Sequence, residues 1–136
     1  MATIFTENAG RFLTPQETKA MTRSYRDQKL AVGLSANDYV RSEYFGINQI
    51  NELLNKEGCV GLRIHHAKRW EDAEGNPTKE GTGQLKPRVL LTAVDARGQD
   101  IVTKQDNRSL KDMSVNRGDD TLGDGYTCPQ HCPTNS

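Results

Sequence analysis

The stretch that decides the fold is GCVGLRIHH, residues 58–66, because the spacing of the apolar residues changes there. Before Gly58 apolar residues recur at steps of three and four, which is the period of one face of an α-helix. After Gly58 they alternate, which is the period of a β-strand with two different faces. One face carries Val60, Leu62, Ile64 and His66, and the other carries Gly61, Arg63 and His65. We expect the first face to be buried and the second to face water.

The residues before Gly58 predict the best helix in the chain. Ser35 and Asp38 form a helix-capping signature ahead of the apolar pattern, and Gly46 can divide the segment into a short helix and a longer one. The apolar residues at helical steps are Val40, Tyr44, Ile47, Ile50 and Leu54, with Leu53 widening the stripe. We expect the part from about residue 46 to residue 57 to pack on the sheet. The expected contacts join Ile47, Ile50 and Leu54 to Val60, Leu62 and Ile64.

An earlier helix is predicted from about Pro15 to about Arg26. Thr14 can cap its first turn, Pro15 suits the first helical position, and Glu17 can return a bond to the Thr14 amide. Its apolar stripe is narrow, so much of its surface should face water or a partner.

Two further β-rich runs follow the first strand. Residues 89–94 predict a second strand, and the turn residues DARG at 95–98 lead into a third strand at 99–102. The connection from Trp70 to Pro87 is too long for an ordinary hairpin turn. The sequence therefore predicts an α+β fold with two to three helices packed on one face of a small antiparallel sheet of about three strands.

The remaining residues have little apolar content. Beyond Val102 the apolar residues are scattered without a period among charges, Asn and Gly, so ordering this segment gains little burial. We therefore expect a single α+β domain over residues 1–102 and a poorly ordered polar tail over residues 103–136.

Composition narrows the function classes. Eighteen basic residues balance eighteen acidic ones, so no long-range field favours binding to nucleic acid or to an anionic membrane. The N-terminal residues lack the features of a signal peptide and no apolar run has the length of a membrane span, which predicts a cytoplasmic protein. With 34% hydrophobic residues the core must be thin. Burial against a second copy would compensate, so self-association is expected.

The tail carries the most unusual residue cluster. Cys128, His131 and Cys132 have side chains that zinc prefers, at a spacing that lets two or three of them face one ion. A fourth ligand would have to come from elsewhere: Cys59, His65, His66 or a second chain. Free thiols in a flexible tail and a disulfide are the alternatives, and the sequence leaves all three open. Zinc is therefore a possible cofactor, and the sequence indicates no other.

Trp70, Arg63 and His65 are the candidate interaction residues. Trp70 stands where the first strand is expected to leave the sheet, and aromatic residues at such rims often anchor partners. No catalytic triad, carboxylate pair or cofactor fingerprint can be assembled from local motifs. A catalytic role would be suspected if a pocket gathered His65, Arg63 and an acidic group. The leading hypothesis is a non-enzymatic interaction or structural module that forms a homo-oligomer, and an unidentified protein could be a further partner. The alternative is a zinc-binding protein or small metalloenzyme.

Several short motifs carry a resemblance to a known group. They are FGIN at 45–48, LL at 53–54, GCVGLRI at 58–64, AVDARGQD at 93–100 and the Cys-Pro pairs of the tail. Over about residues 44 to 102 and the tail cysteines, the chain resembles a group of small bacterial proteins in which a helix leads into a short sheet. The group has no established activity, so the resemblance implies a fold and no site residues. The connection from Trp70 to Pro87 is longer than that pattern suggests.

Overall fold

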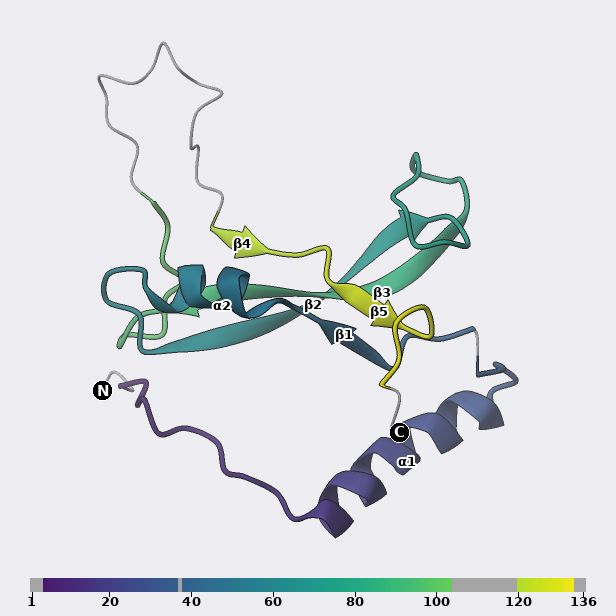
Figure 1. Cartoon of the computed structure of the whole chain (residues 1–136), viewed down its shortest axis with the longest axis horizontal. Coiled ribbons are helices and arrows are strands. Elements are labelled where there is room, and N and C mark those ends of the chain that lie inside the picture. The colour runs from purple at the N-terminus through teal and green to yellow at the C-terminus, as the bar shows by residue number, and fades with distance from the viewer. Residues whose placement is uncertain (1–3, 37, 104–119, 134–136) are drawn as a thin grey trace. The chain divides into compact units, whose positions relative to one another are not determined.

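The computed structural model describes residues 4–36, 38–103 and 120–133. Within them the chain forms two helices and two small antiparallel sheets (Figure 1), which confirms the α+β class. Neither helix is long and apolar enough to cross a membrane. The elements in chain order are α1 (Pro15–Ala31), β1 (Ser42–Tyr44), α2 (Ile47–Leu54), β2 (Gly61–Glu71), β3 (Gln84–Val94), β4 (Thr121–Leu122) and β5 (Tyr126–Cys128).

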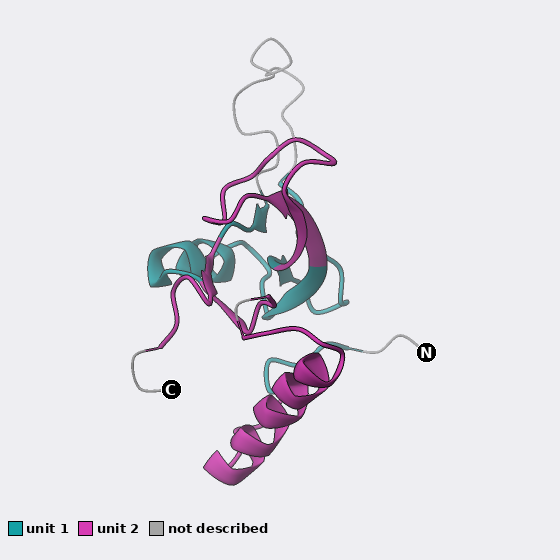
Figure 2. Cartoon of the chain, turned by 90° about the vertical axis from the view of Figure 1, so that its right-hand side faces the viewer, with its two compact units in different colours: residues 1–9, 45–66, 89–124 teal, residues 10–44, 67–88, 125–136 magenta. Residues whose placement is uncertain are grey.

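The chain divides into two compact units (Figure 2). Unit 1 comprises residues 1–9, 45–66 and 89–124, and unit 2 comprises residues 10–44, 67–88 and 125–136. Strands β2 and β3 each contribute to both units, so each strand is teal over one part and magenta over the other. The predicted single domain over residues 1–102 stays a prediction.

Unit 1 contains the hydrophobic core. Leu53 of α2 packs with Leu91 and Ala93 of β3, and all three side chains are buried. The sheet order is β2-β3-β4, with Leu91 opposite Leu122 in the antiparallel β3–β4 pair. The partly buried residues around this core are Phe45, Cys59, Leu62, Ile101 and Leu122.

The predicted helix before Gly58 is shorter than expected. It begins after Gly46 and ends at Leu54, whereas residues 42–44 are strand β1. Those residues pair with β5, more than eighty positions later in the chain, and this long-range pairing overrides the local helical period. Ser35 and Asp38 bond to each other in a local turn instead of capping a helix.

The predicted buried face of α2 is also wrong. Leu53 is 4% exposed, whereas Ile47 is 72% and Leu54 is 45% exposed. On β2 the exposed fraction of Ile64 is 60%. Helix α2 has eight residues, so it makes about two turns and buries only a narrow face. Leu53 is the buried residue of that face.

The predicted strands at 60–66 and 89–94 form as parts of longer strands of eleven residues each, except that β2 begins at Gly61 and Val60 precedes it. The turn at residues 95–98 also forms: the Gly98 amide donates to the Asp95 carbonyl, and the Asp95 carboxylate accepts from the Arg97 and Gln99 amides. Residues 99–102 contact β3 through a single bridge between Val94 and Asp100 and form no strand of their own. Strand β4 takes the third place in the sheet.

The tail prediction is wrong for residues 120–133. This segment contains β4, β5 and a disulfide between Cys128 and Cys132. Asp120 is buried and accepts bonds from the Lys56 ammonium and from the Thr103 amide. The rest of the predicted tail, residues 104–119 and 134–136, lies outside the described residues.

The first helix forms as predicted and runs five residues further. Thr14 and Glu17 make the reciprocal bonds of a capping box. The hydrogen bond from Arg11 and these capping bonds lower the pKa of Glu17 to about 2. No residue of α1 is buried, and its exposed side chains include Met21 and Leu30.

Replacing Leu53 by Ala should lower the free energy of unfolding by about 2 to 5 kcal/mol, because a buried leucine at the centre of the core is truncated. Leu54→Ala is the matched control, since it removes the same atoms from a half-exposed position. Urea denaturation followed by circular dichroism measures both. Equal losses for the two variants would contradict the assignment of the buried face.

Acidification should reduce the contribution of the Asp120 carboxylate to the free energy of unfolding. Burial raises the pKa of this carboxyl, but the bonds from Lys56 and Thr103 outweigh burial and the net shift is downward. A lowered pKa gives stability that is full above the unfolded value and is lost as the pH falls through the folded value. The difference in unfolding free energy between the natural chain and Asp120→Asn should therefore be largest near neutral pH and shrink below about pH 4. A difference that stays constant with pH would refute this.

Candidate functional site

Unit 2 has a charged interior. Glu71 and Arg88 are among the most buried residues of the unit, and the side chain of Glu43 is also withdrawn from water. Taking a charge out of water costs several kcal/mol unless the charge is paired. The positions of these side chains are therefore tightly coupled to one another.

Four side chains form what we call the buried ion cluster: Glu43 of β1, Arg69 and Glu71 of β2, and Arg88 of β3. The Arg88 guanidinium lies 3.3 Å from Glu43 Oε2 and 3.4 Å from Glu71 Oε2. Arg69 Nε donates to the same Glu71 oxygen at 3.0 Å. Two positive and two negative charges thus balance within the cluster.

The buried ion cluster also holds the C-terminal segment. Arg88 Nη2 donates to the Gly125 carbonyl at 3.0 Å, and the Gly125 amide donates to Glu43 Oε2 at 2.9 Å. Both backbone groups of Gly125 are therefore satisfied by cluster side chains, at the residue that precedes β5. This pins the start of β5 beside β1.

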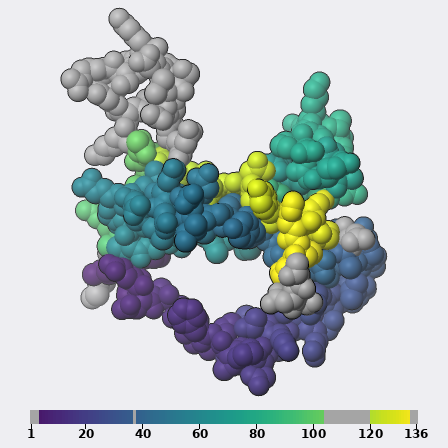
Figure 3. Space-filling view, in the orientation of Figure 1, coloured from purple at the N-terminus to yellow at the C-terminus, as the bar shows by residue number. Residues whose placement is uncertain are grey.

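A disulfide between Cys128 and Cys132 closes a small loop directly after β5. The backbone fixes both ends of the loop: the Arg41 amide donates to the Cys128 carbonyl at 3.1 Å, and the His131 amide donates to the Thr127 carbonyl at 2.7 Å. The Arg41 side chain turns toward the bridge, and its Nη2 lies 3.6 Å from Cys132 Sγ. In the space-filling view the yellow C-terminal residues lie at the surface (Figure 3).

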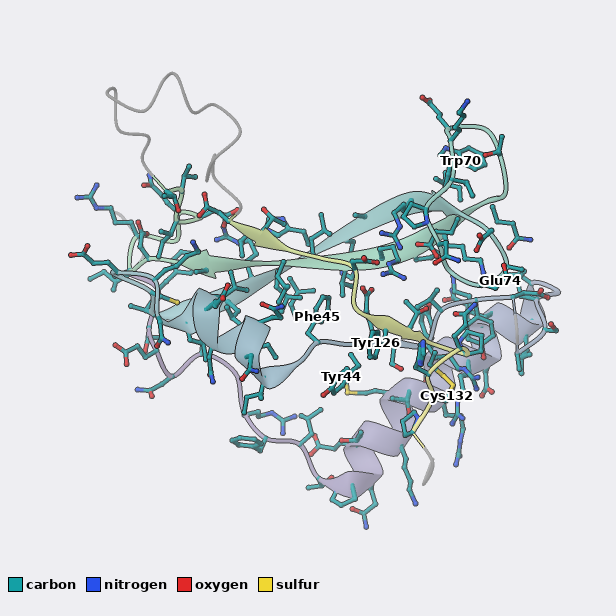
Figure 4. The ribbon with its side chains drawn as sticks, turned by 45° about the horizontal axis from the view of Figure 1, so that its top comes forward. Tyr44, Phe45, Trp70, Glu74, Tyr126 and Cys132 are labelled. Carbon is teal, nitrogen blue, oxygen red and sulfur yellow. A yellow bond between two sulfur atoms is a disulfide. The ribbon has the colours of Figure 1, made fainter. Side chains whose placement is uncertain are left out.

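The outer face of the β1–β5 ribbon carries a stack of three rings. Tyr44 lies opposite Tyr126 in the ladder, with ring centroids 5.8 Å apart, and the His131 ring lies 4.8 Å from that of Tyr126. Glu43 and Thr127 alternate with these tyrosines and are turned inward. Figure 4 shows Tyr44 and Tyr126 side by side, with the disulfide close by. We call Tyr44, Tyr126 and His131 the aromatic platform.

A hollow of about 590 Å³ lies beside the disulfide loop, and its lining includes Pro129, Gln130, Asp38 and Lys86. Gln130 reaches across to donate to the Ala73 carbonyl at 2.9 Å. Neither sulfur lines the hollow. It is therefore a wide surface depression next to the loop and not a pocket for the disulfide.

Two of the three predicted zinc ligands are oxidised in the structure. Cys128 and Cys132 are joined to each other, and a disulfide sulfur is not the thiolate that binds zinc. His131 stacks on Tyr126. Within residues 4–36, 38–103 and 120–133 no group of three or more metal-binding side chains gathers. Zinc binding by the reduced chain stays a prediction.

Two of the predicted interaction residues, Arg63 and His65, meet on Asp100 in unit 1. Arg63 bonds to the Asp100 carboxylate and to the Gly98 carbonyl. His65 Nε2 lies 3.0 Å from Thr92 Oγ1 and 3.3 Å from Asp100 Oδ2. In a catalytic triad the hydroxyl and the carboxylate contact opposite ring nitrogens, whereas here both contact the same one. This arrangement fixes the 95–98 turn on β2 and is unsuited to proton relay.

The third predicted interaction residue, Trp70, belongs to unit 2. It is half-buried near the end of β2, and its carbonyl accepts a bond from the Thr78 amide at 2.9 Å. In Figure 4 it lies far along the hairpin, apart from Tyr44, Tyr126 and Cys132. A role of Trp70 in binding stays a prediction.

No sequence pattern singles out Arg41, the tyrosines of the platform or the four members of the buried ion cluster as site residues. Glutamate and arginine are mostly surface residues, so nothing at positions 43, 71 or 88 marks them as buried. The one available signal is the spacing of Arg69 and Glu71, because residues two positions apart in a strand lie on the same face.

The comparisons with known proteins add no further constraint. The chain matches no protein-family model, no curated protein and no solved structure. The resemblance of residues 44 to 102 to a bacterial group stays a prediction, and the site rests on the geometry described above.

Arg88→Met should cost about 3 to 5 kcal/mol of stability, because Glu43 and Glu71 would then be buried with less countercharge. Arg11→Met is the matched control: it breaks an ion pair with Glu17 that lies in water, so little change is expected. Thermal and urea unfolding of both variants measure the difference. Similar small effects would show that the cluster does not hold unit 2 together.

Proposed function

We propose that this protein is an interaction module that self-associates through the aromatic platform. The observation that carries the proposal is the stacked pair of exposed tyrosines on the β1–β5 ribbon. Tyr44 is 61% and Tyr126 is 58% exposed, although each bears a large apolar ring. Tyrosine is enriched at the centre of protein interfaces, where a few such residues supply most of the binding energy.

The platform is well mounted for binding. Its tyrosines lie on the paired strands β1 and β5. The buried ion cluster holds Gly125, the residue before β5, and the disulfide closes the loop that carries His131. Association therefore costs less ordering entropy than it would for rings on a mobile segment. The rings also stack in the free chain, so the surface is formed in advance.

A second copy of the chain fits this surface on two grounds. The formal net charge is zero, so copies do not repel one another through their overall charge. Among the described residues, moreover, Tyr44 and Tyr126 are adjacent exposed aromatic side chains, and packing them against a second copy would remove both rings from water. A two-fold arrangement would place platform against platform.

Sedimentation equilibrium over a wide concentration range tests the proposal. The natural chain should form a dimer, and Tyr126→Ala should raise the dissociation constant by about tenfold or more, because truncating a central aromatic hot spot costs about 2 kcal/mol or more. Ile64→Ala is the matched control, since it removes an equally exposed apolar side chain from a strand in unit 1. It should leave the dissociation constant unchanged.

Two results would reject the proposal. One is a natural chain that stays monomeric at the highest concentration reached. The other is a dimer that Tyr126→Ala and Ile64→Ala weaken equally, which would place the interface away from the platform.

A further inference from the structure

We propose that Cys128 and Cys132 form a reversible thiol–disulfide centre in which Cys132 is the reactive sulfur and Arg41 stabilises its thiolate. The partner would be a disulfide of another thiol compound or protein. This inference is independent of self-association, because it concerns the sulfurs and not the tyrosine rings.

The two sulfurs differ in accessibility. Cys128 is 4% exposed and lies within β5, whereas Cys132 is half-buried in the loop that follows. An incoming group can therefore reach Cys132 more readily than Cys128. Redox-active cysteines are often accessible and lie next to a second cysteine that resolves the mixed disulfide.

The Arg41 guanidinium supplies the positive charge that would stabilise a Cys132 thiolate. Its Nη2 contacts Cys132 Sγ at 3.6 Å, and its Nε is buried with no hydrogen-bond partner among the described residues. The guanidinium also lies 6.0 Å from the Tyr39 ring, so the side chain is held in a half-buried position. Within the described part of the chain no carboxylate pairs with it. A thiolate on Cys132 would give this cation a countercharge, and a neighbouring arginine lowers the pKa of a thiol.

The other titratable group of the loop is turned elsewhere. His131 directly precedes Cys132, but its ring stacks on Tyr126 and its amide is bonded to the Thr127 carbonyl. Arg41 is therefore the charged side chain that contacts the reactive sulfur.

Thiol–disulfide exchange with the partner proceeds in two steps. In the reduced protein the Cys132 thiolate attacks one sulfur of a partner disulfide, which forms a mixed disulfide and releases the other partner sulfur as a thiolate. The Cys128 thiol then gives its proton to water and attacks Cys132 Sγ as a thiolate, which closes the internal bridge and expels the second partner sulfur as a thiolate. Each released partner thiolate takes up a proton from water to become a thiol. The two cysteines are oxidised by two electrons and the partner disulfide is reduced to two thiols.

The fold can withstand both states. The bridge spans a sequence separation of four, and so short a loop removes less entropy from the unfolded chain than a long one. The buried ion cluster and the β1–β5 ladder hold the segment independently of the sulfurs. Opening the bridge should therefore leave Cys132 displayed at the same place.

The first test is alkylation of the reduced natural chain with iodoacetamide from pH 5 to pH 9, read by peptide mass mapping. Cys59 is an internal reference, because it is a free, half-buried cysteine whose thiol donates to the Gly61 carbonyl. Cys132 should react about tenfold faster than Cys59 near pH 6.5, with its midpoint shifted to lower pH. Equal rates and midpoints would overturn the proposal.

Variants then assign the effect to Arg41. Arg41→Gln should slow the labelling of Cys132 near pH 6.5 by about tenfold. Arg41→Lys should restore part of the rate, because it keeps a positive charge. Arg97→Gln is the matched control, since it removes the same charge from an exposed turn in unit 1. If Arg41→Gln and Arg97→Gln had the same effect, Arg41 would have no specific role.

The second test follows the exchange itself, with oxidised glutathione as the probe. Reduced Cys128→Ser should accumulate a mixed disulfide at Cys132, seen as one glutathione by mass, whereas the natural chain should pass on to the internal bridge. Reduced Cys132→Ser should react more slowly, because its remaining tail sulfur is shielded. A Cys128→Ser chain that stays unmodified, or a natural chain that does not close its bridge, would reject the mechanism.

Discussion

Glu43, Glu71 and Arg88 are withdrawn from water and must remain paired, with the partly exposed Arg69 as a fourth partner. In unit 2 this requirement fixes the backbone around them. The four side chains come from three strands, and two of them also bond the amide and the carbonyl of Gly125. As a result β5 lies beside β1, and the ribbon they form carries the exposed tyrosines outward. The disulfide loop continues directly from this ribbon. Each candidate site of unit 2 therefore depends on charge pairing beneath it and not on a large apolar core.

How far the sequence predicts this structure depends on the distance between interacting residues. The capping box of Thr14 and Glu17 and the turn after Asp95 are set by neighbours, and both were predicted. The helix predicted around Tyr44 does not form, because residues 42–44 pair with strand β5. Leu53 was assigned to the edge of the apolar stripe and not to its centre, because α2 is too short for its period to define a face. The buried ion cluster gave no signal, since its members are distant in sequence and of residue types usually exposed.

The two proposals use different atoms of the same ribbon. Self-association needs the apolar faces of Tyr44 and Tyr126, whereas thiol chemistry needs the edge of the loop where Arg41 meets Cys132. His131 lies between them, bonded through its amide to Thr127 and stacked through its ring on Tyr126. Because the ion cluster holds the ribbon in place, a change at the sulfurs need not disturb the rings. The platform and the thiol centre can therefore be separated experimentally.

Amide hydrogen exchange over residues 125–133 tests the central claim most directly, namely that this C-terminal segment is an ordered part of unit 2. The structure predicts protection at the amides of Gly125 and His131, which donate to Glu43 and to the Thr127 carbonyl. It also predicts that Arg88→Met removes this protection at Gly125 and along β5. Exchange at the rate of an unstructured peptide throughout the segment of the natural chain would contradict the account and restore a disordered tail.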